Sequence, residues 1–328
     1  MRGLPTIEFL TFCLQQAPGV GDATLRSVLK RISEEGLSAA KFLQLSDQTI
    51  QSHYRLKLPA IAALRHPEPD TSETWERMLA DFVKVLVFGQ PGYPPQLQNL
   101  LRGKVPPILF ALGNLDLFQL PAVGFCGSRK ASDKGLQVAS ECARLLAQQR
   151  INVVSGYAHG VDLAAHRAAL ESGGTTTLVL AEGIRHFRLK EEIRDVVGEG
   201  DLSRILVVSE FSPDLPWRAH NAMTRNRTIC GLARALIVIE SGLKGGTFEA
   251  GITALELGEP LFCVEYADPA PSATGNAFFL QQGAFNLKRS RDGQPNLSKL
   301  LSFVRNGGRV DYPPGGQAVM LLKEKAES

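Results

Sequence analysis

Residues 122–182 read AVGFCGSRKASDKGLQVASECARLLAQQRINVVSGYAHGVDLAAHRAALESGGTTTLVLAE, and this stretch decides the fold. It contains two successive units in which a short apolar run leads through a glycine turn into an amphipathic helical pattern. The first turn is Gly127-Ser128-Arg129, and the second spans residues 155–160. In a parallel sheet both turns lie at the carboxyl edge, where backbone N–H groups at helix starts can face an anion. We therefore expect the functional site on this glycine-lined edge.

Length and composition set the broad class of the protein. The chain has 328 residues, of which 44% are hydrophobic, so it can bury a large core and form two or three domains. No apolar run approaches the roughly 20 residues of a transmembrane helix, and the first residues lack the pattern of a signal peptide. These features predict a soluble, cytoplasmic protein with no membrane partner.

The cysteine pattern and the lack of recognisable catalytic motifs indicate the class of protein. Five widely spaced cysteines lie in mostly apolar runs, an arrangement typical of buried free thiols in a reducing compartment: Cys13, Cys126, Cys142, Cys230 and Cys263. No metal-ligand spacing, Walker-type loop, Ser-His-Asp order or pair of catalytic carboxylates stands out. The sequence therefore predicts a binding protein without a metal or cofactor rather than an enzyme.

A cationic segment precedes the apolar run at 235–239. The formal net charge of +3 is too small to indicate a nucleic-acid partner, but residues 215–239 contain four arginines and His220 with no acidic residue. Within it, Arg225 and Arg227 are spaced i and i+2, which places them on different sides of a helix. We therefore expect a loop or a helix start that aims both at a shared anion. A solvated surface, or pairing with remote carboxylates, is the alternative.

The chain divides into four regions by pattern. Residues 1–65 are helical, and their turn Pro18-Gly19-Val20-Gly21 resembles a helix-hairpin-helix (SAM-like) turn that presents N–H groups to a phosphate; packing against a neighbour is the alternative. Residues 66–79 are polar and proline-bearing, as in a linker. Residues 80–290 alternate apolar strands with helices, which predicts an α/β, Rossmann-like, mostly parallel sheet covered by helices. Residues 291–328 form an extension with no clear winged helix.

Residues 92–113, 122–180 and 205–284 resemble the DNA-processing protein A family (DprA, also called Smf). The matching pieces, in the family's order, are Tyr93-Pro94 with Pro107 and Leu109; Gly127-Ser128-Arg129 with Gly135; SGYAHGVDLAAHRAAL at 155–170; Ser209-Glu210; Arg225-Asn226-Arg227-Thr228-Ile229 with Gly231-Leu232; and Gly275-Asn276 with Gly283-Ala284. The resemblance implies a Rossmann-like fold that binds and protects single-stranded DNA. It also implies a homodimer that assists loading of a RecA-type recombinase in natural transformation and recombination.

The chain departs from the family pattern without changing the expected fold. His186-Phe187-Arg188 replaces a common Tyr-Pro, and Glu265-Tyr266 replaces a common Pro-Gly. A third departure, GGTFE at 245–249, looks like the loop of lysine-decarboxylase-like nucleotide phosphoribohydrolases, in which a glutamate acts near the ribose. This likeness gives the alternative function of a nucleotide-binding or nucleotide-cleaving Rossmann protein with Glu249 at its site. The other reading of Glu249 is an acid that favours a helix start.

The expected interface is a basic, glycine-lined rim that holds the backbone of single-stranded DNA by N–H and guanidinium contacts. We call it the glycine rim; its residues are Gly127, Ser128, Arg129, Lys130, Ser155, Gly156, Gly160, Arg225, Asn226, Arg227, Lys244, Gly245, Gly246 and Thr247.

Other residues have supporting roles in this prediction. Base stacking or simple packing is expected of four rings: Tyr157, His186, Phe187 and Trp217. We expect Asp162 to fix its turn through backbone amides and His166 to pack or bond to it. A surplus of apolar side chains predicts a dimer surface that includes Phe262, Phe278, Phe279 and Leu280.

Overall fold

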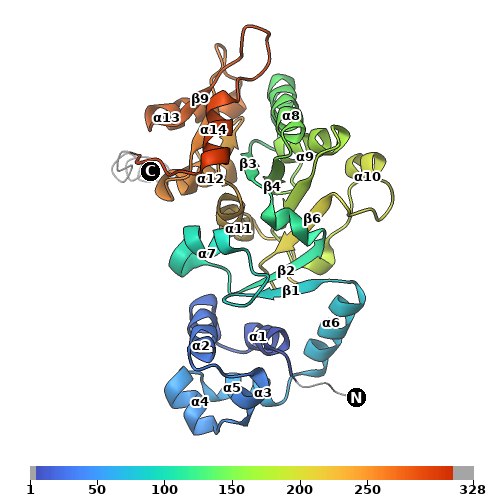
Figure 1. Cartoon of the computed structure of the whole chain (residues 1–328), viewed down its shortest axis with the longest axis vertical. Helices are drawn as coiled ribbons and strands as arrows, with labels where there is room; N and C mark the ends of the chain where they lie inside the picture. Colours follow the sequence, from blue (N-terminus) through green and yellow to red (C-terminus); the bar gives the residue numbers. More distant parts are fainter. Residues whose placement is uncertain (1–4, 313–328) are drawn as a thin grey trace. The chain divides into compact units, whose positions relative to one another are not determined.

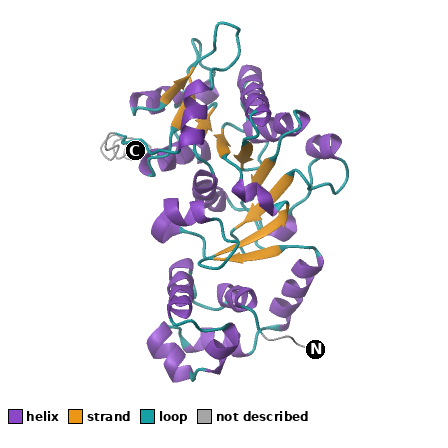
Figure 2. Ribbon diagram, in the orientation of Figure 1, coloured by secondary structure: helices purple, strands orange, loops and turns teal. Residues whose placement is uncertain are grey.

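The computed structural model describes residues 5–312 of the chain (Figure 1). They divide into two compact units. The first unit contains the chain up to Leu112 together with residues 182–187 and 207–217, and the second contains residues 113–181, 188–206 and the chain from Arg218 onward. Both units combine helices with strands (Figure 2).

The first unit begins with a group of short helices. They are α1 (Ile7–Gln16), α2 (Asp22–Glu34), α3 (Ala39–Gln44), α4 (Asp47–Tyr54), α5 (Leu58–Arg65) and α6 (Pro69–Ala80). Thr6, Ser38 and Ser46 cap α1, α3 and α4 by accepting a hydrogen bond from the backbone N–H three residues on. Apolar side chains of α1 to α5 form a common core, so the predicted helical N-terminal region is confirmed.

The segment at 66–79, which its composition predicts as a linker, is mostly helix α6. Pro69 occupies the start of the helix and Asp70 its first turn, both favourable there. Trp75 packs against the rings of Phe9 and Phe12, with ring centroids 5.2 and 5.5 Å away, and Met78 is fully buried. The Trp75 contacts hold α6 against α1, although the segment is polar on average.

Two antiparallel strands and several short helices follow α6 in the first unit. The elements are β1 (Lys84–Val87), α7 (Pro95–Leu101), the 3-10 helix η1 (Arg102–Lys104), β2 (Ile108–Gly113) and η3 (Ile184–His186). Strands β1 and β2 are antiparallel, with Lys84 opposite Ala111 and Val87 opposite Ile108. The Tyr93 hydroxyl donates to the Pro106 carbonyl at 2.6 Å and fixes the connection between the two strands.

The second unit alternates strands with helices. Its elements are η2 (Leu115–Gln119), β3 (Ala122–Cys126), α8 (Asp133–Gln148), β4 (Asn152–Ser155), α9 (Val161–Glu171), β5 (Thr176–Val179), α10 (Glu191–Val197), α11 (Ala219–Leu232), β7 (Leu236–Val238), α12 (Gly246–Glu256), β8 (Leu261–Val264), η4 (Pro271–Ala273), α13 (Asn276–Gln281), β9 (Phe285–Leu287) and α14 (Ser298–Asn306); β6 (Ile205–Ser209) has residues of both units. The strands that lie wholly in the second unit have the order β5-β4-β3-β7-β8-β9. Within the second unit β5-β4-β3-β7-β8-β9 is parallel throughout, which confirms the predicted Rossmann-like α/β class.

Strand β3 shows how helices cover both faces of this sheet. Val123 and Phe125 are fully buried in a cluster with side chains of α8 and α9. Gly124 faces the opposite side, where an added Cβ would lie 3.3 Å from Ile229 of α11. Alternate residues of one strand thus pack on opposite helical layers, as in a doubly covered parallel sheet.

Three further expectations can be compared with the structure. All five cysteines are buried and free, as predicted. Among the helices of residues 5–312, none combines the length and the apolar character needed to cross a bilayer. Of the predicted C-terminal extension, the structure describes α14 and the chain to residue 312, and residues 313–328 lie outside the described part.

Candidate nucleic-acid interface

Three loops lie side by side at the carboxyl edge of the parallel sheet. They follow β4, β3 and β7, which are neighbours in that order, and comprise residues 155–160, 127–130 and 240–247. We call them the strand-end loops. Each leads toward the start of a helix, namely α9, α8 and α12. The predicted convergence of glycine turns on one edge is therefore present.

Two glycines hold the first two loops together. An added Cβ on Gly127 would lie 2.3 Å from Cγ2 of Val161, the first residue of α9. Gly160 has φ +78°, and an added Cβ there would lie 2.4 Å from the Ser128 carbonyl oxygen. A side chain would collide with the Val161 side chain at Gly127 and with backbone at Gly160, so both glycines have a structural role in bringing the loops into contact.

A buried carboxylate fixes the third loop. Glu240, in the loop after β7, is fully buried and accepts hydrogen bonds from the Ser132 hydroxyl and, at 3.0 Å, from the Ser132 backbone N–H. The Ser272 hydroxyl donates to the same carboxylate at 2.5 Å. Ser132 is also the N-cap of α8, accepting from Gly135 N–H at 3.1 Å. Glu240 thus connects the loop after β7 to the helix that follows β3.

The glycine turn after β4 surrounds a buried charged pair. Asp162 accepts a hydrogen bond from Ala158 N–H at 3.2 Å, which confirms its predicted role in fixing the turn. Arg225 of α11 is only 6% exposed, and its guanidinium lies against Gly156. Burial raises the pKa of Asp162, while the positive charge of Arg225 lowers it. Arg225 therefore serves inside the protein as a counter-charge to Asp162.

The structure corrects the prediction for residues 225–227. They lie in the middle of helix α11, not in a loop or at a helix start. Because residues i and i+2 point to different sides of a helix, Arg225 faces the interior and Arg227 is half-buried. Asn226 donates through Nδ2 to the Gly246 carbonyl at 2.9 Å and so connects α11 to the loop after β7. The two arginines do not converge on a shared anion.

Exposed cations remain on the strand-end loops. Arg129 and Lys130 are exposed after β3, and Lys244 is exposed after β7. Gly245, with φ +96°, is the exposed N-cap of α12, and no side chain caps the first backbone N–H groups of this helix. Ser128 accepts from Lys130 N–H at 3.0 Å and shapes the first loop. Exposed N–H groups beside three cations form a surface suited to successive phosphates.

His166 and Tyr157 have packing roles that differ in part from those expected. The buried His166 ring bonds through Nδ1 to the Thr176 hydroxyl at 2.6 Å rather than to Asp162. Burial lowers its pKa to about 3. The Tyr157 hydroxyl accepts from Lys190 N–H at 2.6 Å, and the Lys190 ammonium lies 4.5 Å from the ring centroid. Tyr157 is 9% exposed and is part of the packed turn, so it is not a base-stacking platform.

Three aromatic candidates and two further arginines, Arg26 and Arg234, remain to be placed. His186, Phe187 and Trp217 lie in the first unit, where the Trp217 side chain is 47% exposed, and their stacking role stays a prediction. Near the turn at 18–21, Arg26 donates to the Val105 carbonyl at 2.8 Å. In the second unit, Arg234 donates to the Val304 carbonyl at 2.7 Å. Arg26 and Arg234 thus bind backbone carbonyls of the protein itself.

Two of the four side chains expected on a dimer surface are in the core. Phe262 packs against Phe285 with ring centroids 5.1 Å apart, and Phe279 is fully buried against Gly251. Phe278 and Leu280 are half-buried. The surplus of apolar side chains is therefore smaller than the sequence indicates.

Asn276 is a key residue whose role the sequence analysis missed. Its Nδ2 donates to the carbonyls of Ile239 and Val264, at 2.7 and 2.8 Å, and its Oδ1 accepts from Ser241 N–H at 2.8 Å. It thereby joins the carboxyl ends of β7 and β8. The only available signal was its place in the Gly275-Asn276 pair, which gives no role by itself.

Within residues 5–312, no three histidine, cysteine or acidic side chains gather as a metal site would require.

Comparison with known proteins identifies the family to which this chain is similar. Residues 84–296 match the model of the family described as DNA recombination-mediator protein A. The chain is 32% identical over 236 residues to the Escherichia coli protein Smf, covering 70% of this chain and 61% of that protein. It is 33% identical over 195 residues to the DNA processing protein DprA of Streptococcus pneumoniae, covering 58% and 66%.

Solved structures agree with this placement. The X-ray structure of DprA from Streptococcus pneumoniae has a TM-score of 0.72 and 26% identity, over 86% of this chain and 95% of that one. A structure that describes the single-stranded DNA binding mode of DNA processing protein A from Helicobacter pylori has a TM-score of 0.53 at 22% identity, over 68% and 94%, and shows the shared fold. The chain spans less than two thirds of the length of the two curated relatives above.

Proposed function

The chain belongs to the DNA recombination-mediator protein A family, and from this membership we propose that it binds single-stranded DNA at the carboxyl edge of its parallel sheet. The observation that supports the proposal is the set of three adjacent strand-end loops with Arg129, Lys130 and Lys244 exposed on them. Backbone N–H groups and side-chain cations would hold successive phosphates, which positions a strand without reading its sequence.

A preference for single strands follows from the shape of the contacting elements. The exposed cations lie on short loops and at helix starts rather than along an exposed helix that could enter a major groove. A flexible single strand can bend to follow three loops, whereas a duplex holds its phosphates on a stiff helix. We expect contacts to the strand backbone, with bases turned toward neighbouring side chains.

The test is a titration of the full chain with matched single- and double-stranded oligonucleotides at several salt concentrations. Single-strand affinity should fall by roughly 0.7 log units per log unit of salt for each phosphate neutralised. Fluorescence anisotropy measures the affinity for each oligonucleotide and its dependence on salt. Equal or tighter binding of the duplex, or affinity independent of salt, would contradict the proposal.

Family membership also supports three finer proposals. The bound strand is passed to a RecA-type recombinase during natural transformation and recombination, the protein acts as a homodimer, and it works in the cytoplasm. Strand exchange by RecA on DNA coated with a single-strand binding protein tests the first: the chain should accelerate it, and no acceleration speaks against the partner. Light scattering at tens of micromolar should give twice the mass of one chain if the dimer forms.

A binding role is favoured over a catalytic one. Asp162 is occupied by the turn and His166 by Thr176, so neither is arranged as an acid or base toward a ligand. Glu249 lies in the first turn of α12, where its charge favours the helix start. If the chain instead cleaved nucleoside monophosphates, the wild type would release free base and Glu249→Ala would abolish that release. We expect no release from either, and unchanged or slightly tighter DNA binding by Glu249→Ala.

A further inference from the structure

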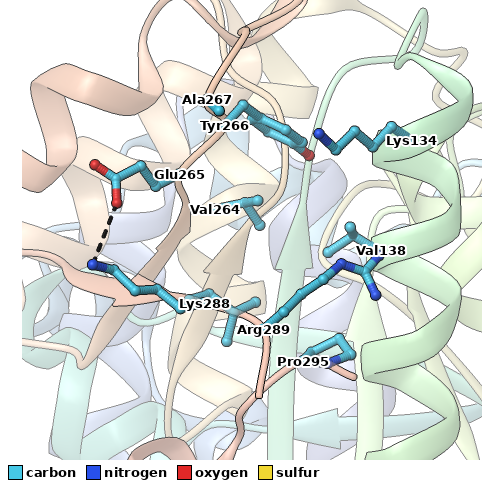
Figure 3. Close-up of a pocket in the computed structure, with 10 residues that line it drawn as sticks. Lys134, Val138, Val264, Glu265, Tyr266, Ala267, Lys288, Arg289 and Pro295 are labelled. Atoms are coloured by element: carbon cyan, nitrogen blue, oxygen red, sulfur yellow. Dashed lines mark ion pairs between the residues drawn. The ribbon is translucent and has the colours of Figure 1, made fainter. Parts of the chain in front are cut away.

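A pocket of about 650 Å³ lies beyond the strand-end loops, where β8 and β9 end (Figure 3). Its walls come from the last residue of each of these two strands and the residues that follow it, from the first turns of α8 and from Pro295. Its volume falls within the range of roughly 300–1,000 Å³ typical of small-molecule sites. In open α/β sheets this edge is where ligands bind. We call it the Tyr266 pocket.

The pocket combines an apolar floor with an aromatic wall. Val138, Val264 and Leu287 are each less than a tenth exposed and form the apolar part. Figure 3 shows the Tyr266 ring along one side, Lys288 and Arg289 along the other, and Val264 between them. A flat apolar group would fit between the ring and the floor. Tyr266 belongs to the Glu265-Tyr266 pair in which the chain departs from its family.

The Tyr266 hydroxyl has no hydrogen-bond partner within residues 5–312. Its oxygen is buried and makes no hydrogen bond with any of the residues that the structure describes. A tyrosine hydroxyl is ordinarily protonated at neutral pH, and burial raises its pKa further, so the Tyr266 hydroxyl is a donor. A buried donor without an acceptor costs free energy, which a ligand with a suitably placed oxygen or nitrogen would recover.

The charges of the pocket suit one negative group. Lys288 pairs with Glu265 at 3.7 Å and Arg289 with Glu141 at 2.9 Å, so these cations are already balanced. Lys134 lies 5.6 Å from the Tyr266 ring centroid, and no ion pair joins it to a carboxylate among residues 5–312. The surplus is therefore about one positive charge at the rim, which matches one phosphate better than a polyphosphate.

From this combination we propose that the Tyr266 pocket binds one nucleotide unit, with the base against Tyr266 and the apolar floor and the phosphate facing Lys134. The unit is either a free nucleoside monophosphate or one nucleotide of a bound strand. The second source rests on the proposed DNA binding: Lys134 is five residues beyond Arg129, so a strand on the strand-end loops could continue into the pocket.

Calorimetric titration of the full chain with deoxyadenosine monophosphate tests whether the pocket binds a free nucleotide. Because base–aromatic stacking is worth about 1–3 kcal/mol, Tyr266→Leu should weaken binding by at least about fivefold. Tyr266→Phe, which keeps the ring, should weaken it less. Lys134→Gln should also weaken it, whereas Lys299→Gln should not. Lys299 is a matched control because its ammonium also lies over a ring, that of Phe285, outside the pocket.

The same variants are titrated with a single-stranded oligonucleotide to test the strand source. If Tyr266→Leu weakens DNA binding and the monophosphate competes with DNA, the pocket holds a nucleotide of the strand. If the monophosphate binds without displacing DNA, the pocket holds a free nucleotide. If neither Tyr266→Leu nor Lys134→Gln changes the affinity for either ligand, the proposal is wrong. The monophosphate titration needs no DNA, so it tests nucleotide binding by the pocket even if the chain does not bind single strands. Lys134 is exposed, so its variant decides the question should Tyr266→Leu not fold.

Discussion

The guanidinium of Arg225 occupies the space that a side chain on Gly156 would need: an added Cβ there would lie 1.5 Å from Nη1. Gly156 follows β4, and Arg225 lies on α11, 69 positions later in the chain. Their contact places a buried cation beneath the turn whose Ala158 N–H binds Asp162. The turn after β4 is thus held from inside the protein, which leaves its outer side to a ligand.

This contact predicts that Gly156→Ala destabilises the second unit. The new methyl group must displace a buried cation that faces a buried carboxylate, so we expect a loss of about 3 kcal/mol in the free energy of unfolding. Urea denaturation measures it. Gly242→Ala is the control, because an added Cβ there would meet only an ordinary contact at 3.6 Å and its backbone needs no positive φ. Equal effects of both substitutions would show that Arg225 can move at little cost.

Substitutions of the two arginines of α11 should differ in their effects on folding stability and on DNA affinity. Arg225→Ala leaves Asp162 buried without its counter-charge and should cost about 3–5 kcal/mol of folding stability. Arg227 is half-buried, and Arg227→Ala should change stability by no more than about 0.5 kcal/mol. Any loss of DNA affinity by Arg227→Ala would therefore report a phosphate contact. Thermal unfolding measures the change in stability, and fluorescence anisotropy measures the change in DNA affinity. A large loss of stability by Arg227→Ala would contradict the assignment of a structural role to Arg225 alone.

Arg129 is the strongest single test of the strand-end loops. Because it is exposed, Arg129→Ala should leave folding stability within about 0.5 kcal/mol of the wild type. It should weaken single-strand binding and reduce the salt slope by about 0.7, since one fewer phosphate is neutralised. Lys244→Ala should act in the same direction. Arg167→Ala is the control, because Arg167 is exposed on α9 and pairs with Glu171 at 2.7 Å. A matching loss with the control would point to nonspecific attraction.

The sequence was sufficient for the sheet and for two of its strand-end turns, because these depend on local patterns. Continuous apolar runs and glycine turns specify β3 and β4 without reference to the rest of the chain. The roles of Arg225 and Phe279 depend on partners far away in the sequence, Gly156 and Gly251. Charge and hydrophobicity alone predicted a surface role for each, whereas tertiary packing buried both. The burial of Arg225 therefore required the structure, although its position beside the site did not.

His166 provides a prediction for the pH dependence of stability. Burial, together with the positive charges of Lys190 and Arg225, lowers its pKa from the ordinary value of 6.5 to about 3. Between these values the unfolded chain binds a proton that the folded chain does not, so the stability that His166 contributes is present above pH 6.5 and is lost as the pH falls.

We therefore expect the free energy of unfolding to fall by about 2 kcal/mol more in the wild type than in His166→Gln between pH 7.5 and pH 5. Urea denaturation of both proteins at the two pH values measures the difference. Comparison with the variant is needed because the raised pKa of Asp162 acts in the opposite sense, favouring the folded state at low pH. A wild type and variant that lose the same stability would show that the folded protein protonates this ring, which its burial beside Thr176 should prevent.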